Sequence, residues 1–209
     1  DYVFMWGWGV MNQVAIQEAA NIRYPMENFI GVWWSGSEND VLPVGDKANG
    51  YKALAFHNVG SDFPIFDDIK KYVVDAGKAA GAGDQVGTVL YNRGMYNALL
   101  LTEAAKTAQA LSGKTAISQA DMIKGMEALE ITEEKMAALG LPGFGPSFKV
   151  SCQNHGGDGM VGVAQWDANA GKWSLISNYQ QSDMSVLQPL IDADSGAFAS
   201  ENNLTPNCN

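Results

Sequence analysis

The order of apolar segments in the first 76 residues limits the fold more than any other feature of the sequence. Short runs with the apolar and aromatic composition of buried strands lie at 2–8, 28–35 and 51–57. Segments with the periodicity of amphipathic helices lie at 11–23 and 64–76, and Asp62 is the candidate N-cap of the second. Because parallel strands need a crossover between them, this alternation predicts an α/β protein with a parallel sheet.

The sequence changes character after residue 76. A stretch rich in glycine and alanine at 77–87 is the best linker candidate. Helical patterns follow at 94–111, 118–129 and about 132–139. Ser118 and Asp121 open the second of these as the acidic form of a capping box. Strand patterns then lie at 147–152, 159–167 and 172–179, and the chain ends in a polar tail with one short helical pattern.

The composition argues against several classes of function. The chain has 23 acidic residues against 13 lysines and arginines, a net charge of −10 that repels phosphate backbones and argues against a nucleic-acid partner. It contains no run of 18 or more apolar residues, so we expect no membrane-spanning segment. A metal or catalytic site would need His57 and His155 joined by Cys, Asp or Glu at ligand spacing, and the turn composition around His155 favours a solvated loop. Phosphate-loop and nucleophile-elbow patterns are missing. We therefore predict neither a cofactor, nor a metal, nor an enzyme.

The two cysteines, Cys152 and Cys208, allow two interpretations. They are either unrelated buried thiols or one disulfide that ties the C-terminal tail to the body of the protein. An even number of cysteines in a chain with the character of an exported protein favours the disulfide. The bridge would close a loop of about 57 residues, for which chain entropy predicts a stabilisation of roughly 4 kcal/mol.

Several short motifs occur in a fixed order along the chain. They are DYVFMWGW at 1–8, FIGVWWSG at 29–36, ANGY at 48–51, YNAL at 96–99 with EAA at 103–105, and the segments 143–148 and 161–167. No motif is specific alone, but in order and spacing they resemble the type I periplasmic binding proteins of the leucine/isoleucine/valine-binding group. The resemblance covers roughly residues 1–179.

This resemblance implies two α/β lobes that hinge shut on a small-molecule ligand, in a bacterial periplasmic protein that serves the permease subunits of an ABC transporter. The expected parts are a C-terminal lobe at 1–86, a helical segment returning to the N-terminal lobe at 87–145, closing strands at 146–179 and a tail at 180–209. Because the chain opens inside an apolar run, we expect most of the N-terminal lobe to precede it. A ligand-sensing ectodomain or regulator with the same fold is the alternative.

Four tryptophans mark the candidate ligand site, since Trp6, Trp8, Trp33 and Trp34 lie at or beside the ends of the first two strand runs. Ligands of open parallel sheets bind beyond the carboxyl ends of the strands. The rings are either core or ligand wall, and strand alternation predicts that one ring of each pair packs inward. Trp8 and Trp33 match ligand-facing positions of the family, and Trp34 is a further candidate. Such rings suit a ligand with an apolar or aromatic body.

The polar candidates are Arg93 and, more weakly, Ser35 and Glu38. Arg93 could bind a carboxylate through two N–H groups, or it could be a solvated loop arginine. Branched-chain amino-acid binders of the family commonly carry an acidic residue where Trp33 stands, which puts amino-acid specificity in doubt. We therefore expect a small acid, amide or amino acid with an apolar or aromatic body.

Overall fold

A computed structural model describes residues 1–81, 83–205 and 208, and the chain divides into two compact units. The first unit comprises Asp1–Leu99, Thr132–Ser147 and Val161–Tyr179. The second comprises Leu100–Ile131, Phe148–Met160 and Gln180–Asn209. Each unit is built from segments that are distant in the sequence, so the chain passes from one to the other more than once.

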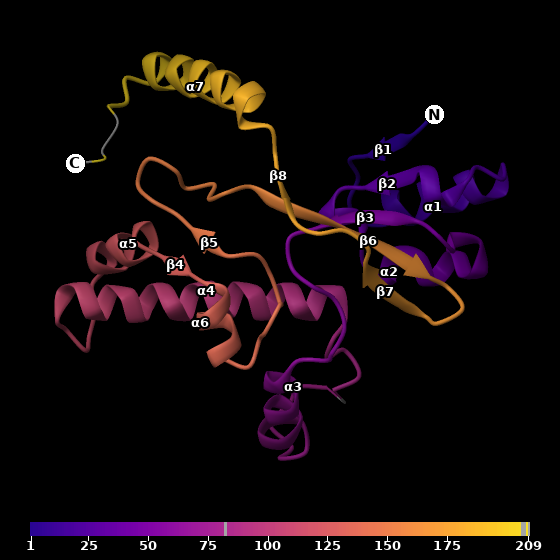
Figure 1. Cartoon of the computed structure of the whole chain (residues 1–209), viewed down its shortest axis with the longest axis horizontal. Coiled ribbons are helices and arrows are strands. Elements are labelled where there is room, and N and C mark those ends of the chain that lie inside the picture. Colours follow the sequence, from indigo (N-terminus) through magenta and orange to yellow (C-terminus); the bar gives the residue numbers. More distant parts are fainter. Residues whose placement is uncertain (82, 206–207, 209) are drawn as a thin grey trace. The chain divides into compact units, whose positions relative to one another are not determined.

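The first unit is built on a sheet in the order β1-β2-β3-β6-β7. Its strands are β1 (Val3–Met5), β2 (Phe29–Gly31), β3 (Lys52–Ala55), β6 (Met160–Asp167) and β7 (Lys172–Leu175). The first three pair in parallel and lie side by side in Figure 1, which confirms the predicted α/β fold. β6 pairs with β3, and β7 pairs with β6, both in antiparallel fashion. The short turn between β6 and β7 is compatible only with a hairpin.

The first two strands are shorter than their apolar runs. β1 ends at Met5, and after β2 the chain turns at Val32 into a 3₁₀ turn, Trp33–Ser35. All four tryptophans of the candidate site therefore lie in loops beyond the strands. Gly31, at the start of the loop after β2, lies close to the side chain of Tyr51. A Cβ on Gly31 would lie 2.1 Å from the Tyr51 hydroxyl oxygen, so the position needs glycine.

The other elements of the first unit are helices and helical turns. They are α1 (Val10–Asn21), the turn Met26–Asn28, α2 (Glu38–Val41), the turn Leu42–Ala48, α3 (Pro64–Ile69) with a π-helical turn Lys70–Val74, and α6 (Glu133–Ala138). Ile16, Val41, Tyr51 and Trp166 belong to the buried core. Phe63, and not the predicted Asp62, is the N-cap of α3, so this prediction was wrong. The helix begins at Pro64, whose ring already holds φ near the helical value.

The long helix α4 (Val89–Ser112) contains residues of both units (Figure 1). It begins five residues before the predicted start at 94. The Glu38 carboxylate accepts a hydrogen bond from the Val89 N–H, at 3.1 Å to Oε2, and satisfies a donor that would otherwise be unpaired. Because this cap comes from a residue far away in the sequence, local pattern does not reveal it.

The second unit contains the rest of α4, α5 (Gln119–Glu127), α7 (Met184–Glu201) and the short strands β4 (Glu130–Ile131), β5 (Phe148–Lys149) and β8 (Gln180–Gln181). The Ser118–Asp121 capping box is confirmed. Gly125 lets α5 approach α4 closely, since a Cβ there would lie 2.4 Å from the Ala104 carbonyl oxygen. β4 and β5 form an antiparallel pair. Among the described residues, no helix is both long and apolar enough to cross a membrane.

Candidate ligand-binding site

The loops after β1 and β2 bring Trp6, Trp8, Trp33 and Trp34 together, and we call these four residues the tryptophan cluster. Ring centroids lie 5.9 Å apart for Trp6 and Trp33, 6.0 Å for Trp8 and Trp34, and 5.2 Å for Trp33 and Trp34. Trp6 and Trp8 are 75% and 65% exposed. The expectation that one ring of each pair packs inward was wrong for Trp6 and Trp8, because both follow the last strand residue and alternation no longer applies there.

An exposed cluster of this kind is unusual on a protein surface. An indole ring left in water forgoes the large favourable free energy of burying an aromatic side chain. Contiguous exposed apolar patches therefore commonly mark binding sites. Trp33 is half-buried and Trp34 is 46% exposed, so the cluster runs from the protein interior to solvent. The cluster therefore offers a wall for an apolar or aromatic group.

Arg93 lies in the second turn of α4 and reaches the inner side of this wall. Its Nη2 group donates a hydrogen bond to the Trp33 carbonyl oxygen at 2.7 Å. Its guanidinium carbon is 5.5 Å from the centroid of the Phe56 ring, which itself lies 6.4 Å from that of Trp33. The interpretation of Arg93 as a solvated loop arginine was therefore wrong. Burial lowers the pKa of its guanidinium, although the charge of Asp40 opposes this effect.

A buried polar network holds the two tryptophan-bearing loops together. The Asn12 amide donates from Nδ2 to the Trp34 carbonyl oxygen at 2.8 Å and to Asp40 Oδ1 at 3.0 Å. The Ser35 hydroxyl lies 2.8 Å from the Gly7 carbonyl oxygen and 3.0 Å from Asn12 Oδ1, and can donate its one proton to either. Asn12 and Ser35 are both fully buried. Ser35, a predicted ligand contact, is thus placed inside the network instead of at the surface.

Two carboxylates lie beside the site, and protein donors already occupy both. Asp40 Oδ2 accepts from the Ser37 N–H at 2.9 Å and from the Ser37 hydroxyl at 2.7 Å, while Oδ1 accepts from Asn12. Glu38 accepts from Val89 at the start of α4. Burial raises the pKa of Glu38, partly offset by its backbone hydrogen bonds.

His57 belongs to a second aromatic group behind the site. It is 1% exposed, and its ring stacks on Phe144 at 5.9 Å and lies 6.2 Å from the Tyr96 ring. Burial lowers the pKa of His57 to about 4, so the imidazole is neutral at pH 7 and its Nδ1–H can donate to the Asn58 carbonyl oxygen at 2.9 Å. No local pattern around His57 predicts this burial, and its contacts indicate a structural role.

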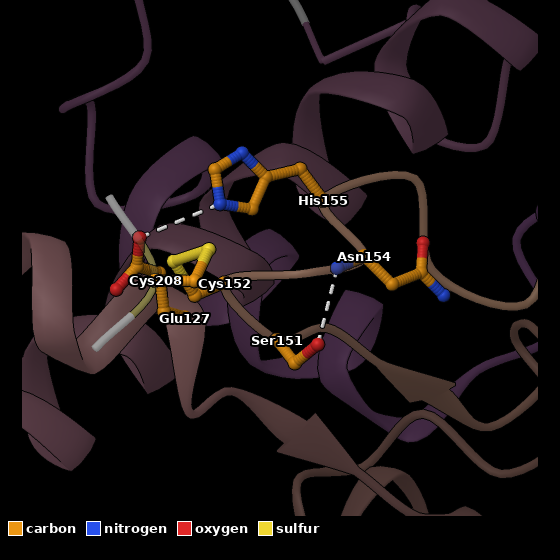
Figure 2. Close-up of a disulfide and its surroundings, with 6 residues drawn as sticks. All are labelled: Glu127, Ser151, Cys152, Asn154, His155 and Cys208. Atoms are coloured by element: carbon orange, nitrogen blue, oxygen red, sulfur yellow. Dashed lines mark hydrogen bonds and ion pairs between the residues drawn. A yellow bond between two sulfur atoms is a disulfide. The ribbon is translucent and has the colours of Figure 1, made fainter. Parts of the chain in front are cut away.

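The predicted disulfide between Cys152 and Cys208 is confirmed, with Cα atoms 5.4 Å apart. Figure 2 shows Glu127 and His155 beside it, with His155 Nε2 3.4 Å from Glu127 Oε1. Ligand atoms of Glu127, Cys152 and His155 lie within 4.8 Å of one another, as in a metal site. The sulfur of Cys152 is committed to the disulfide, however, and so cannot serve as a thiolate ligand.

An apolar pocket of about 380 Å³ lies in the second unit, against α4 and α5. Its apolar lining includes Leu100, Leu101, Ile123, Met126, Phe148 and Val150. Sequence analysis did not predict it, because its helical residues have the spacing of an ordinary core face. It lies in a different unit from the tryptophan cluster and contains none of the predicted site residues.

The sequence of the chain matches a known protein family. Residues 1–172 match the family described as periplasmic binding protein. The chain belongs to this family. The predicted resemblance to periplasmic binding proteins is thereby confirmed. Among curated proteins, none matches the chain.

Three solved structures share the fold of this chain. A structure from the Pseudomonas fluorescens group, described as an ABC transporter permease, is 39% identical and superposes with a TM-score of 0.91 over 100% of this chain and 50% of its own. A branched-chain amino acid ABC transporter protein from Thermus thermophilus with bound valine is 16% identical, with a TM-score of 0.60 over 87% of this chain and 46% of its own.

A third structure, a solute-binding protein of R. palustris in complex with benzoate, is 16% identical, with a TM-score of 0.54 over 88% of this chain and 45% of its own. At such identities the last two structures show only that the fold is shared. This periplasmic binding protein spans about half the length of the proteins it matches, 50%, 46% and 45% of them.

Proposed function

We propose that the chain is part of the exported solute-binding component of a bacterial ABC importer, and that the tryptophan cluster forms one wall of its ligand site. The observation that carries this proposal is the cluster of four indole rings, of which Trp6, Trp8 and Trp34 are exposed, beyond the carboxyl ends of β1 and β2. Ligands of open parallel sheets bind in this position. The ligand would be a small acid, amide or amino acid with an apolar or aromatic body.

The proposed mechanism is lobe closure. In our proposal residues 1–86 belong to the C-terminal lobe, and residues 87–145 return to the N-terminal lobe. The closing strands 146–179 lie at the hinge and in the C-terminal lobe. The ligand would be covered by the tryptophan cluster on one side and by groups of the N-terminal lobe on the other. Because the ligand contacts both lobes only in the closed form, binding would shift the population toward that form, which the permease subunits recognise in the periplasm.

Titration calorimetry on the intact binding protein tests this function. The panel contains benzoate, benzamide, phenylalanine and leucine, together with the branched aliphatic acid and amide of similar size. We expect at least one compound to bind with a negative change in heat capacity, since apolar surface is buried on binding. Absence of binding by every compound in the panel would contradict the proposal.

A further inference from the structure

We propose that the head group of the ligand is a carboxylate bound by Arg93, so that the site selects anions over ammonium compounds and zwitterionic amino acids. This inference rests on the proposed function, because it names the ligand class of the same site. It is argued from the hydrogen bonds of Arg93 and from the acids that surround it.

Arg93 is a cation with unused donors. A guanidinium carries five N–H groups, and the hydrogen bond to the Trp33 carbonyl oxygen uses one of them. The Nε atom is shielded from solvent and has no hydrogen-bond partner within the described residues. A buried donor without an acceptor costs free energy, which an incoming acceptor recovers.

Arg93 also lacks a carboxylate partner of its own. Among the residues described, none of the acidic side chains forms an ion pair with Arg93 within 4.0 Å. Asp40 contributes a favourable charge at longer range, but its two oxygens accept from Asn12 and Ser37. A ligand carboxylate would therefore supply the anion that the protein does not place against this guanidinium, in the two-pronged geometry that arginine favours.

An ammonium head group would find no equivalent partner on this side of the site. Of the two neighbouring acids, Asp40 is buried and accepts three hydrogen bonds, and Glu38 accepts from the first N–H of α4. Neither can turn to a ligand without leaving a protein donor unpaired. An ammonium would also be repelled by Arg93, so this part of the site both attracts carboxylates and disfavours cations.

The position of Arg93 favours a head group attached directly to the apolar body. The guanidinium lies between the backbone of Trp33 and the ring of Phe56, at the inner edge of the tryptophan cluster. A carboxylate at this point leaves the body of the ligand against Trp33 and Trp34. Arylcarboxylates and short branched aliphatic carboxylates have this arrangement of head and body.

Calorimetry with matched head groups on the intact protein tests the inference. Benzoate, benzamide and benzylamine share one ring, 3-methylbutanoate, its amide and its amine share one branched chain, and phenylalanine and leucine present both charges. We expect the acid to bind roughly 10- to 100-fold more tightly than the amide of the same body, as for a charge-assisted hydrogen bond, and the amine to bind least. This comparison needs no variant.

Variants then assign the effect to Arg93. Arg93→Gln should weaken acid binding roughly 10- to 100-fold while leaving amide binding within about threefold, and Arg93→Lys should retain part of the acid preference. Arg23→Gln is the matched control, because it removes the only other arginine of the chain, at an exposed position.

The outcomes separate the two proposals. Acid preference that disappears in Arg93→Gln supports the inference. Amides or only amino acids binding best would overturn it and leave the proposed function standing, as would an acid preference that survives in Arg93→Gln. Amines binding best would overturn it and also contradict the ligand class of the proposed function. If no compound bound in any series, both proposals would fall together.

Discussion

Trp33 joins the apolar and polar parts of the candidate site. Its ring contacts Trp6, Trp34 and Phe56, while its carbonyl oxygen accepts the hydrogen bond from Arg93. The two parts can be separated by mutation, because replacing the side chain leaves the carbonyl in place. The tryptophans and Arg93 could be found from sequence since residue type and strand order mark them. The burial of Ser35 could not, because it depends on contacts with Gly7 and Asn12.

Trp33→Ala and Trp8→Ala should each weaken binding of the identified ligand by about 1–3 kcal/mol, the value of burying a large apolar side chain. Calorimetry on the intact protein measures the change. Tyr72→Ala is the control, since it removes an exposed ring in the turn after α3. If both tryptophan variants bound as tightly as the wild type, the site would have to lie elsewhere.

His57 should make the protein less stable in mild acid. In the unfolded chain the imidazole of His57 has its ordinary pKa of 6.5, whereas in the folded protein its pKa is about 4. The free energy of unfolding therefore falls as the pH drops from 6.5 towards 4, by up to about 3 kcal/mol for this group, and the contribution is fully present above pH 6.5.

Urea unfolding of wild type and His57→Phe at several pH values measures this contribution. Phenylalanine keeps an aromatic ring beside Phe144 but does not titrate, so the stability of the variant should depend less on pH in this interval. His155→Ala is the control at the exposed histidine. Parallel curves for wild type and His57→Phe would show that His57 does not carry the effect.

At the scale of elements, the first two turns of α4 contribute residues to the candidate site. Glu38 caps the helix at Val89, and Arg93 follows one turn later. Local signals predicted the elements that local residues cap, such as α5 with Ser118 and Asp121. They misplaced the start of α4, extended β1 and β2 into loops and missed β4, because distant partners determine those boundaries.

Loss of the Glu38 cap should destabilise the start of α4. Glu38→Ala is expected to lower the free energy of unfolding by about 0.5–2 kcal/mol, as for other helix caps, and to weaken ligand binding through the displaced Arg93. Glu38→Gln keeps an acceptor and should behave more like the wild type. Chemical unfolding and calorimetry measure the two effects. Equal stability of Glu38→Ala and wild type would exclude capping as the role of Glu38.

At the scale of the whole molecule, the order of strands and helices was sufficient to predict the fold class, because few topologies fit a strand–helix alternation with short connections. The predicted division into lobes stays a prediction, since the chain spans only about half the length of the structures it matches. The disulfide between Cys152 and Cys208 was predicted correctly, because an even number of cysteines in a chain with the character of an exported protein favours a bridge over two unrelated thiols.

The disulfide should stabilise the second unit. Replacing Cys152 and Cys208 together by serine is expected to lower the free energy of unfolding by roughly 4 kcal/mol at most, the entropic value for a loop of this size. Denaturant unfolding measures the loss. Thiol titration of the unfolded, unreduced wild type should find no free thiol among the two cysteines, and two reactive thiols would contradict the pairing.

The exposure of the tryptophan cluster gives the protein an internal optical reporter. Indole emission shifts to shorter wavelength when the ring leaves water, and four of the six tryptophans lie in this cluster while Trp166 and Trp173 are 2% and 4% exposed. The buried pair supplies a constant background, so a change in emission on adding a solute comes mainly from the cluster. Occupancy of the proposed site could then be followed in real time without any attached dye.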